Sequence, residues 1–202
     1  MQRIHAVFFH QGAPALGEGA LRTEAALAAL REAAAVHLSP AGQLQVATAL
    51  EVLTAIEARM GTVRQQLLHT ARHLAGAKAL AARVYGVGPV GALAMTCWLG
   101  GADRFSSSRK AVRFTGLDVT VYSSDGKRSP GRLSRQGPEI LRWVAYEAGK
   151  THARASAPGY GYYAAVKDRQ DGKIAALAQA RKIIRQACHI LAELGDDALT
   201  AA

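Results

Sequence analysis

One stretch, residues 40–75, limits the possible folds of this 202-residue chain more than any other. It contains no proline after Pro40, and its apolar side chains recur every three or four residues, which predicts one helix of more than thirty residues. Ser39 and Pro40 form a start signal, because a serine hydroxyl caps free N–H groups and proline loses no hydrogen bond at the first helical position. A helix of this length with one apolar stripe is more typical of pairing with another copy than of wrapping a small core.

The composition favours helix in the rest of the chain as well. Half of the residues are apolar, 6% are aromatic, and Ala and Leu, which lose little on entering a helix, dominate. Cys97 and Cys188 lie in apolar helical contexts and are expected in the core rather than in a disulfide or metal site. No segment is typical of a secretory signal or a membrane span, so we expect a cytoplasmic protein without a membrane partner.

The formal net charge of +10 is concentrated in the second half of the chain. Residues 104–202 hold 17 of the 25 Lys and Arg residues, but only 9 of the 15 Asp and Glu residues. A localised basic excess is expected of a surface that binds a polyanion, because each phosphate contact releases condensed counterions. The alternative is a basic face that serves solubility.

We predict a mainly α protein with four segments. Residues 1–19 are an irregular lead-in or the remnant of an upstream domain. Residues 20–79 form a helical linker, a coiled-coil-like arm for dimerisation. Residues 80–195 form a small helical domain with a helix-hairpin-helix-like unit and a short extended segment, and residues 196–202 form a frayed tail.

Two glycines near position 87 predict a phosphate contact. Gly86 and Gly88 flank Val87, and Pro89 then opens an apolar helix. A helix, a glycine turn and a second helix leave backbone N–H groups exposed at a helix N-terminus, where they can bind one phosphate. This resembles the helix-hairpin-helix module of DNA-binding proteins. The alternative is a tight turn between two packed helices, but the basic half that follows favours DNA.

Residues 115–137 combine hydroxyl groups with cations. Ser123 and Ser124 end a β-prone run, and four basic residues follow before the next helix: Lys127, Arg128, Arg132 and Arg135. A serine hydroxyl can attack a phosphodiester, and cations can hold the pentacovalent phosphate. The alternative is a loop that binds phosphate without chemistry, since such serines are commoner than nucleophilic ones.

Short motifs in a fixed order carry a family likeness. They are GVGP, an apolar helix, ADRFSSSRKAVRFTGLDV, YSSDGKRSPGRLSRQG and PEILRWVAYEAG. Their order resembles the C-terminal transposase domain of the IS-one-ten family of insertion-sequence transposases over roughly residues 80–195. The preceding helical arm resembles the linker of such proteins.

The resemblance implies a serine-dependent DNA recombinase that is guided by a structured RNA and works as a dimer of dimers. Aligned on Gly126-Lys127 and on the run 133–137, Ser124 takes the place of the family's nucleophilic serine. Asp125 stands where that family usually has a glycine. The alternate candidates for the nucleophile are Ser123, one residue away, and Ser134, which matches the family's second serine.

The resemblance also implies Mg²⁺, held by four acidic ligands of a RuvC-like domain. No cofactor or metal site is expected in this chain, because the glutamates before Asp103 resemble solvated helix faces. We therefore expect the RuvC-like half to be missing, and the chain alone to bind nucleic acid but to cut poorly or not at all. Because we expect the chain to bind DNA, we also expect it in the bacterial cytosol, associated with the nucleoid.

The predicted partners are DNA, a structured guide RNA and further copies of the chain, as a dimer through the arm or a tetramer. The predicted nucleic-acid contacts are Gly86, Gly88, Arg104, Lys110, Arg113, Lys127, Arg128, Arg132, Arg135 and Arg142. One alternative function is a non-catalytic helix-hairpin-helix module that binds DNA or RNA. Another is a helical dimerisation protein whose charge serves solubility.

Overall fold

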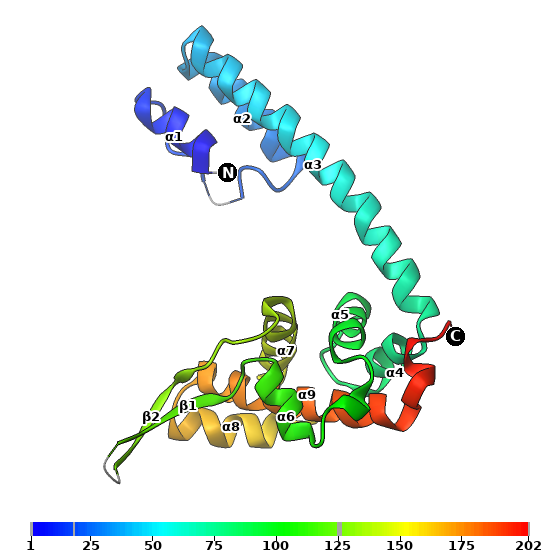
Figure 1. The fold of residues 1–202 in the computed structure, drawn as a ribbon. Coiled ribbons are helices and arrows are strands. Elements are labelled where there is room, and N and C mark those ends of the chain that lie inside the picture. The colour runs from blue at the N-terminus through cyan, green and yellow to red at the C-terminus, as the bar shows by residue number, and fades with distance from the viewer. Residues whose placement is uncertain (1, 18, 125–126, 202) are drawn as a thin grey trace. The chain divides into compact units, whose positions relative to one another are not determined.

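The computed structural model describes residues 2–17, 19–124 and 127–201, and of residues 102, 121–124 and 127–130 it describes the backbone alone (Figure 1). The protein is 73% helical with one small two-stranded sheet, which confirms the predicted mainly α class. The chain divides into two compact units, residues 1–64 and 65–202.

The first unit is built from α1 (Gln2–His10), α2 (Glu24–His37) and the first part of α3 (Pro40–His73). The Thr23 hydroxyl caps α2 by accepting a hydrogen bond from the N–H of Ala26. The core of the first unit is an apolar cluster: Ile4, Phe8, Leu21, Leu30, Ala34, Leu38, Val46 and Leu50. The lead-in expected at residues 1–19 thus contains a helix that contributes Ile4 and Phe8 to this core.

The long helix predicted from the sequence is present as α3, with 34 residues. It begins as expected, because the Ser39 hydroxyl accepts a hydrogen bond from the N–H of Gly42 at 3.3 Å. Val46 and Leu50 are buried in the first unit. Most of the large apolar side chains of α3 are instead exposed: Leu44, Val52, Ile56, Met60, Val63 and Leu67.

The second unit is a set of helices packed around α9 (Figure 1). Its helices are α4 (Ala75–Arg83), α5 (Pro89–Leu99), α6 (Ser108–Phe114), α7 (Glu139–Thr151), α8 (Tyr160–Arg169) and α9 (Gly172–Leu194), with 3-10 turns at Ala102–Arg104 and Gly195–Leu199. The α9 helix contacts all five other α-helices. Asp171 caps it, since its carboxylate accepts a hydrogen bond from the N–H of Ile174 at 2.7 Å.

Small residues let α7 and α9 approach closely. A Cβ atom on Gly149 of α7 would lie 2.4 Å from the carbonyl oxygen of Ala176 and 3.2 Å from the nitrogen of Ala180, both in α9. Ala176 and Ala180 are themselves buried. The two helix backbones therefore touch at Gly149, which leaves no room for any larger residue.

The segment predicted as a frayed tail, residues 196–202, contains part of a 3-10 turn in the residues that the structure describes. The 3-10 turn Gly195–Leu199 buries Ala198 completely, and the N–H of Ala75 donates a hydrogen bond to the carbonyl of Thr200 at 3.1 Å. Gly76 lies against this turn, because its Cβ would be 2.7 Å from the carbonyl oxygen of Ala198. Small residues at the start of α4 thus form a contact surface for the C-terminal 3-10 turn. The sequence pattern does not reveal this contact.

The sheet is an antiparallel hairpin of β1 (Val119–Ser124) and β2 (Lys127–Leu133). The register pairs Val119 with Leu133 and Ser124 with Lys127, with an irregularity between Val119 and Val121. The sequence predicted only a short extended segment followed by a loop. The second strand contains Pro130, which a two-stranded sheet accepts because both strands are edge strands.

The contact at Gly149 gives a test of the packing around α9. Replacing Gly149 with alanine should lower the free energy of unfolding by about 1–3 kcal/mol, because the added Cβ overlaps the α9 backbone. Tryptophan fluorescence during urea unfolding measures this, since Trp98 and Trp143 both lie in the second unit.

The matched control is Gly161→Ala in α8, where a Cβ atom meets nothing within 4 Å. Alanine at this position should leave the stability unchanged or raise it by up to about 1 kcal/mol, because glycine is the poorer helix former. Equal effects of the two substitutions would contradict the close packing of α7 on α9.

Candidate nucleic-acid interface

The candidate nucleophile lies at the tip of the β-hairpin. Ser124 is the last residue of β1 and pairs with Lys127, and Ser123 pairs with Arg128. The structure describes the backbone of these four residues, while Asp125 and Gly126 between them lie outside the described residues. The register therefore sets two hydroxyl residues opposite two cationic residues at neighbouring positions of the hairpin.

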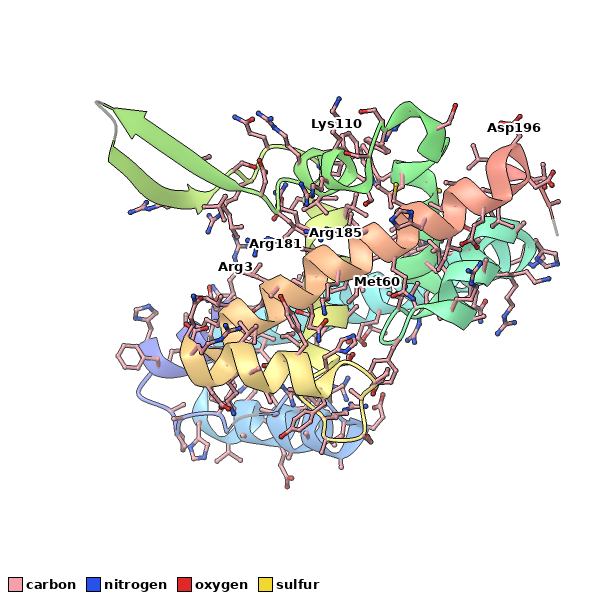
Figure 2. All side chains as sticks on the ribbon, turned by 90° about the horizontal axis from the view of Figure 1, so that it is seen from below. Arg3, Met60, Lys110, Arg181, Arg185 and Asp196 are labelled. Carbon is pink, nitrogen blue, oxygen red and sulfur yellow. The ribbon has the colours of Figure 1, made fainter. Side chains whose placement is uncertain are left out.

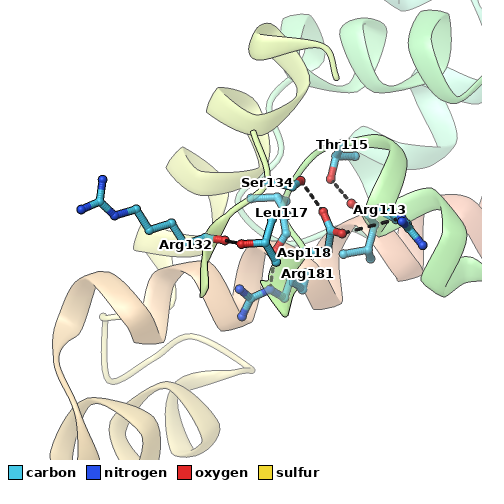
Figure 3. Close-up of polar contacts among 9 residues, drawn as sticks. Arg113, Thr115, Leu117, Asp118, Arg132, Ser134 and Arg181 are labelled. Atoms are coloured by element: carbon cyan, nitrogen blue, oxygen red, sulfur yellow. Dashed lines mark hydrogen bonds and ion pairs between the residues drawn. The ribbon is translucent and has the colours of Figure 1, made fainter. Parts of the chain in front are cut away.

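The third candidate serine, Ser134, lies at the base of the hairpin. Its hydroxyl donates a hydrogen bond to Oδ1 of Asp118 at 2.5 Å, and its N–H donates to the carbonyl of Asp118 at 3.0 Å (Figure 3). Nε of Arg113 lies 3.9 Å from Oδ2 of the same carboxylate. A strand rises about 3.3 Å per residue, so the backbones of Asp118 and Ser124 are about 20 Å apart. The structure therefore does not bring Ser134 together with the other two serines.

Further hydrogen bonds attach the hairpin to the helices. Nε of Arg181 in α9 donates to the carbonyl of Leu117 at 2.7 Å, just before β1 begins (Figure 3). After β2, the guanidinium of Arg142 in α7 donates to the carbonyl of Gly137 at 2.7 Å. Gly137 has φ of +130°, and a Cβ atom there would lie 2.0 Å from the carbonyl oxygen of Phe114. Both ends of the hairpin are thus held by the helical body.

Burial lowers the pKa of Arg181. Loss of solvent is the largest cause, and the positive charge of Arg185 lowers the pKa further, whereas Tyr162 and Asp118 raise it. A guanidinium stays protonated in proteins despite such shifts. The α9 helix therefore carries a fixed positive charge beside the base of the hairpin.

The two glycines of the α4–α5 turn have different surroundings. Gly86 has φ of +82°, and a Cβ atom there would lie 2.3 Å from Oγ1 of Thr151 and 2.9 Å from the carbonyl oxygen of Ala148. Gly88 is exposed, precedes α5 as its N-cap, and has no atom within 4 Å of its Cβ position. Gly86 thus allows the turn to pack on α7, while Gly88 leaves the N-terminus of α5 accessible.

Two of the predicted cationic contacts are used inside the protein. The Arg104 guanidinium donates to the carbonyl of Trp98 and lies 4.6 and 4.7 Å from the ring centroids of Phe105 and Phe114. Arg142 holds the carbonyl of Gly137, as described above. Both residues therefore stabilise the domain, whatever else they contact.

The other predicted cations whose side chains are described are exposed. They are Lys110, Arg113, Arg132 and Arg135. Arg135 has φ of +52°, and its N–H donates to the carbonyl of Gly116 at 3.1 Å. Within the described residues, Arg113 alone among these four forms an ion pair, and its side chain is still 83% exposed. These cations remain accessible to a ligand with phosphate groups.

Sequence reasoning missed Asp118, Arg181 as a support of the hairpin, and His152. His152 is 7% exposed, and neither ring nitrogen has a hydrogen-bond partner among the described residues. Its ring meets that of Tyr85, in the glycine turn, edge to face at 5.1 Å. Burial lowers the pKa of His152, and the charge of Lys182 lowers it further. No local pattern marks these residues, because their partners come from distant parts of the chain.

Within the described ranges, no group of three or more His, Cys, Asp and Glu residues is placed to hold a metal ion. The helices described there include none that is long and apolar enough to cross a membrane.

A helical domain that carries a glycine turn and a cationic hairpin is suited to binding phosphate groups. Residues 78–164, from α4 into α8, match the family described as Transposase IS116/IS110/IS902 family. This confirms the predicted resemblance to the C-terminal transposase domain of that family. The match supports a transposase or recombinase role, with DNA as a binding partner. No curated protein matches the chain.

We expect the domain to lose stability when the side-chain hydrogen bond between Ser134 and Asp118 is removed. Ser134→Ala should lower the free energy of unfolding by about 1.5–3 kcal/mol, because a hydrogen bond to a charged group is lost. Ser106→Ala, at an exposed serine in the loop before α6, should change it by less than about 0.5 kcal/mol. Equal values for the two variants in urea unfolding would show that the bond does not hold the hairpin.

The buried His152 predicts a pH dependence. A histidine whose pKa is lowered in the folded chain contributes stability above the unfolded pKa of about 6.5, and this stability is lost as the pH falls towards the folded pKa. The free energy of unfolding should therefore decrease from neutral to mildly acidic pH, and His152→Gln should weaken this decrease. Urea unfolding at several pH values tests this; identical pH profiles for both proteins would contradict it.

Proposed function

We propose that this chain is the part of a DNA transposase that binds DNA and supplies the serine nucleophile for strand cleavage and exchange. The main support is the register of the hairpin, which sets Ser124 opposite Lys127 and Ser123 opposite Arg128. This hairpin lies inside the segment that matches the transposase family. Ser124 is the preferred nucleophile, because it occupies the position of the family's serine.

The proposed reaction is an exchange of phosphodiester bonds. The Ser124 hydroxyl oxygen attacks a backbone phosphorus, an O–P bond forms, and the bond to one sugar oxygen breaks. The serine loses its proton and the departing sugar oxygen gains one, which leaves a phosphoserine linkage and a free sugar hydroxyl. The number of phosphoester bonds is unchanged. A sugar hydroxyl of another DNA strand can therefore attack the phosphoserine, which rejoins the DNA and releases the serine.

Cations of the hairpin would stabilise the transition state. Lys127 and Arg128 are the paired positions at the tip, and Arg132 lies further along β2. Positive charge at a pentacovalent phosphate is worth more when it is already in place before the reaction. In the resembling family, Mg²⁺ supplies Lewis-acid chemistry from the RuvC-like domain. The described residues of this chain include no group of His, Cys, Asp and Glu side chains that fits such a metal ion.

DNA would also bind at the glycine turn and the exposed cations. The N-terminus of α5 is accessible at Gly88, and helix N-termini bind phosphate through free N–H groups and the helix dipole. Lys110, Arg113 and Arg135 add positive charge in the same unit. A structured guide RNA is proposed as a second ligand, on the basis of the resemblance.

A suicide substrate tests the nucleophile. A DNA duplex nicked near the cleavage site, mixed with this chain, Mg²⁺ and a RuvC-like domain from a family member, should trap a covalent protein–DNA adduct. Ser124→Ala should abolish the adduct, whereas Ser123→Ala should retain it. An adduct that survives Ser124→Ala refutes the assignment, and efficient strand exchange by the chain alone would refute the need for a separate acidic domain.

The second candidate function is binding of DNA or RNA without catalysis. The observation that favours it is the open N-terminus of α5 at Gly88, which can hold a phosphate without any reaction. This function predicts tight, salt-dependent binding and no covalent adduct under any of the conditions above.

We also propose that α3 pairs with a second copy of the chain. Its exposed apolar residues Val52, Ile56, Met60, Val63 and Leu67 recur every three or four positions, which is the spacing of a helix–helix seam. The proposed assembly is a dimer, or a tetramer formed from two dimers.

Charges placed in the seam should break the dimer. Ile56→Glu combined with Met60→Glu should convert a dimer into a monomer in sedimentation velocity, because the paired helices would bury carboxylates. Gln65→Glu, at an exposed polar position of the same helix, should leave the dimer intact. Persistence of the dimer in the double variant would show that α3 is not the interface.

A further inference from the structure

A second basic surface lies on α9, beyond the residues that match the transposase family. It consists of Arg181, Lys182 and Arg185, here called the α9 basic face. Lys182 and Arg185 are exposed, and Arg181 is half-buried. Across the described ranges, none of the three forms an ion pair with a carboxylate.

Two residues of this face, Arg181 and Lys182, contact neutral groups. Nε of Arg181 donates to the carbonyl of Leu117 at 2.7 Å, and Nζ of Lys182 lies 3.5 Å from the ring centroid of Tyr162. Arg181 and Arg185 are one helical turn apart, and Arg185 lowers the pKa of Arg181 by repulsion (Figure 2). Like charges four residues apart destabilise a helix, so this arrangement is unfavourable without a bound anion.

This basic face adjoins the base of the hairpin. Leu117, which Arg181 binds, is two residues before β1. Asp118 also lies close enough to Arg181 to affect its pKa, but its carboxylate is shared with Ser134 and Arg113. Asp118 therefore lies near both Arg113 of α6 and Arg181 of α9, and Arg185 is one helical turn beyond Arg181.

We infer that the α9 basic face binds the sugar-phosphate backbone of duplex DNA next to the segment on which the hairpin acts. This inference rests on the proposed function and adds a contact outside the predicted site residues. One face of the Tyr162 ring is covered by Lys182, so the surface offers cations rather than a free stacking platform. Arg181 and Arg185 are about 6 Å apart along the helix, a span of about two phosphates of one strand.

Salt-dependent binding tests the inference. Fluorescence anisotropy of a labelled random-sequence duplex, measured with the full chain between about 50 and 200 mM salt, gives the slope of log K against log salt. Arg185→Gln should weaken binding and make the slope shallower by about 0.9, the value for one phosphate contact, and Lys182→Gln with Arg185→Gln should double that change. Arg185→Lys should retain most of the slope.

The charge-matched control is Arg59→Gln, at an exposed position of α3 in the first unit. It removes one positive charge and should leave the slope unchanged. All variants should remain folded at the assay temperature, because Lys182 and Arg185 are exposed and surface substitutions usually change stability by only about 0.5 kcal/mol.

The outcomes separate this inference from the proposed function. A steep wild-type slope that Arg185→Gln and the double substitution leave unchanged would overturn the α9 contact and spare the proposed DNA binding. A slope change seen with an RNA duplex of the same sequence but not with DNA would overturn the assignment to DNA. A wild-type chain that binds no DNA at all would overturn both.

Discussion

The packing of α9 is the constraint on which the second unit depends. This 23-residue helix contacts α4, α5, α6, α7 and α8, and Gly149 lets the backbone of α7 touch it directly. Close approach of two backbones requires small side chains on both helices, and Ala176 and Ala180 provide them. Because α9 contacts α6, α7 and α8, the groups attached to it are positioned by the packing of all four helices.

The hairpin that carries the candidate serine is attached to these helices at its base. Arg181 of α9 holds Leu117, Arg142 of α7 holds Gly137, and Ser134 closes the base on Asp118. An isolated two-stranded hairpin is marginally stable in water. The helices therefore supply the stability that the two strands lack, while the tip with Ser124 lies about 20 Å from these anchors.

Local patterns predicted the helices well and the hairpin poorly. The 34-residue α3 and its Ser39 start follow from a long apolar period without proline. The hairpin was expected only as an extended segment, because the second strand, KRSPGRL, lacks β-branched residues, although Asp-Gly at 125–126 is a pair that two-residue hairpin turns favour. The roles of Arg104 and Arg142 were also not predictable, since charge alone does not tell a phosphate contact from an arginine that binds a carbonyl within the domain.

The sequence by itself determined the helical class, the long apolar helix, the basic second half and the order of motifs that marks the transposase domain. All of these depend on neighbouring residues, through periodicity, capping and composition. Only the tertiary structure decided that Ser134 is bound to Asp118, that Gly86 packs while Gly88 stays open, and that Arg181 supports the hairpin. Each of these joins groups far apart in the chain, and such contacts are set by how the helices pack around α9 rather than by local preference.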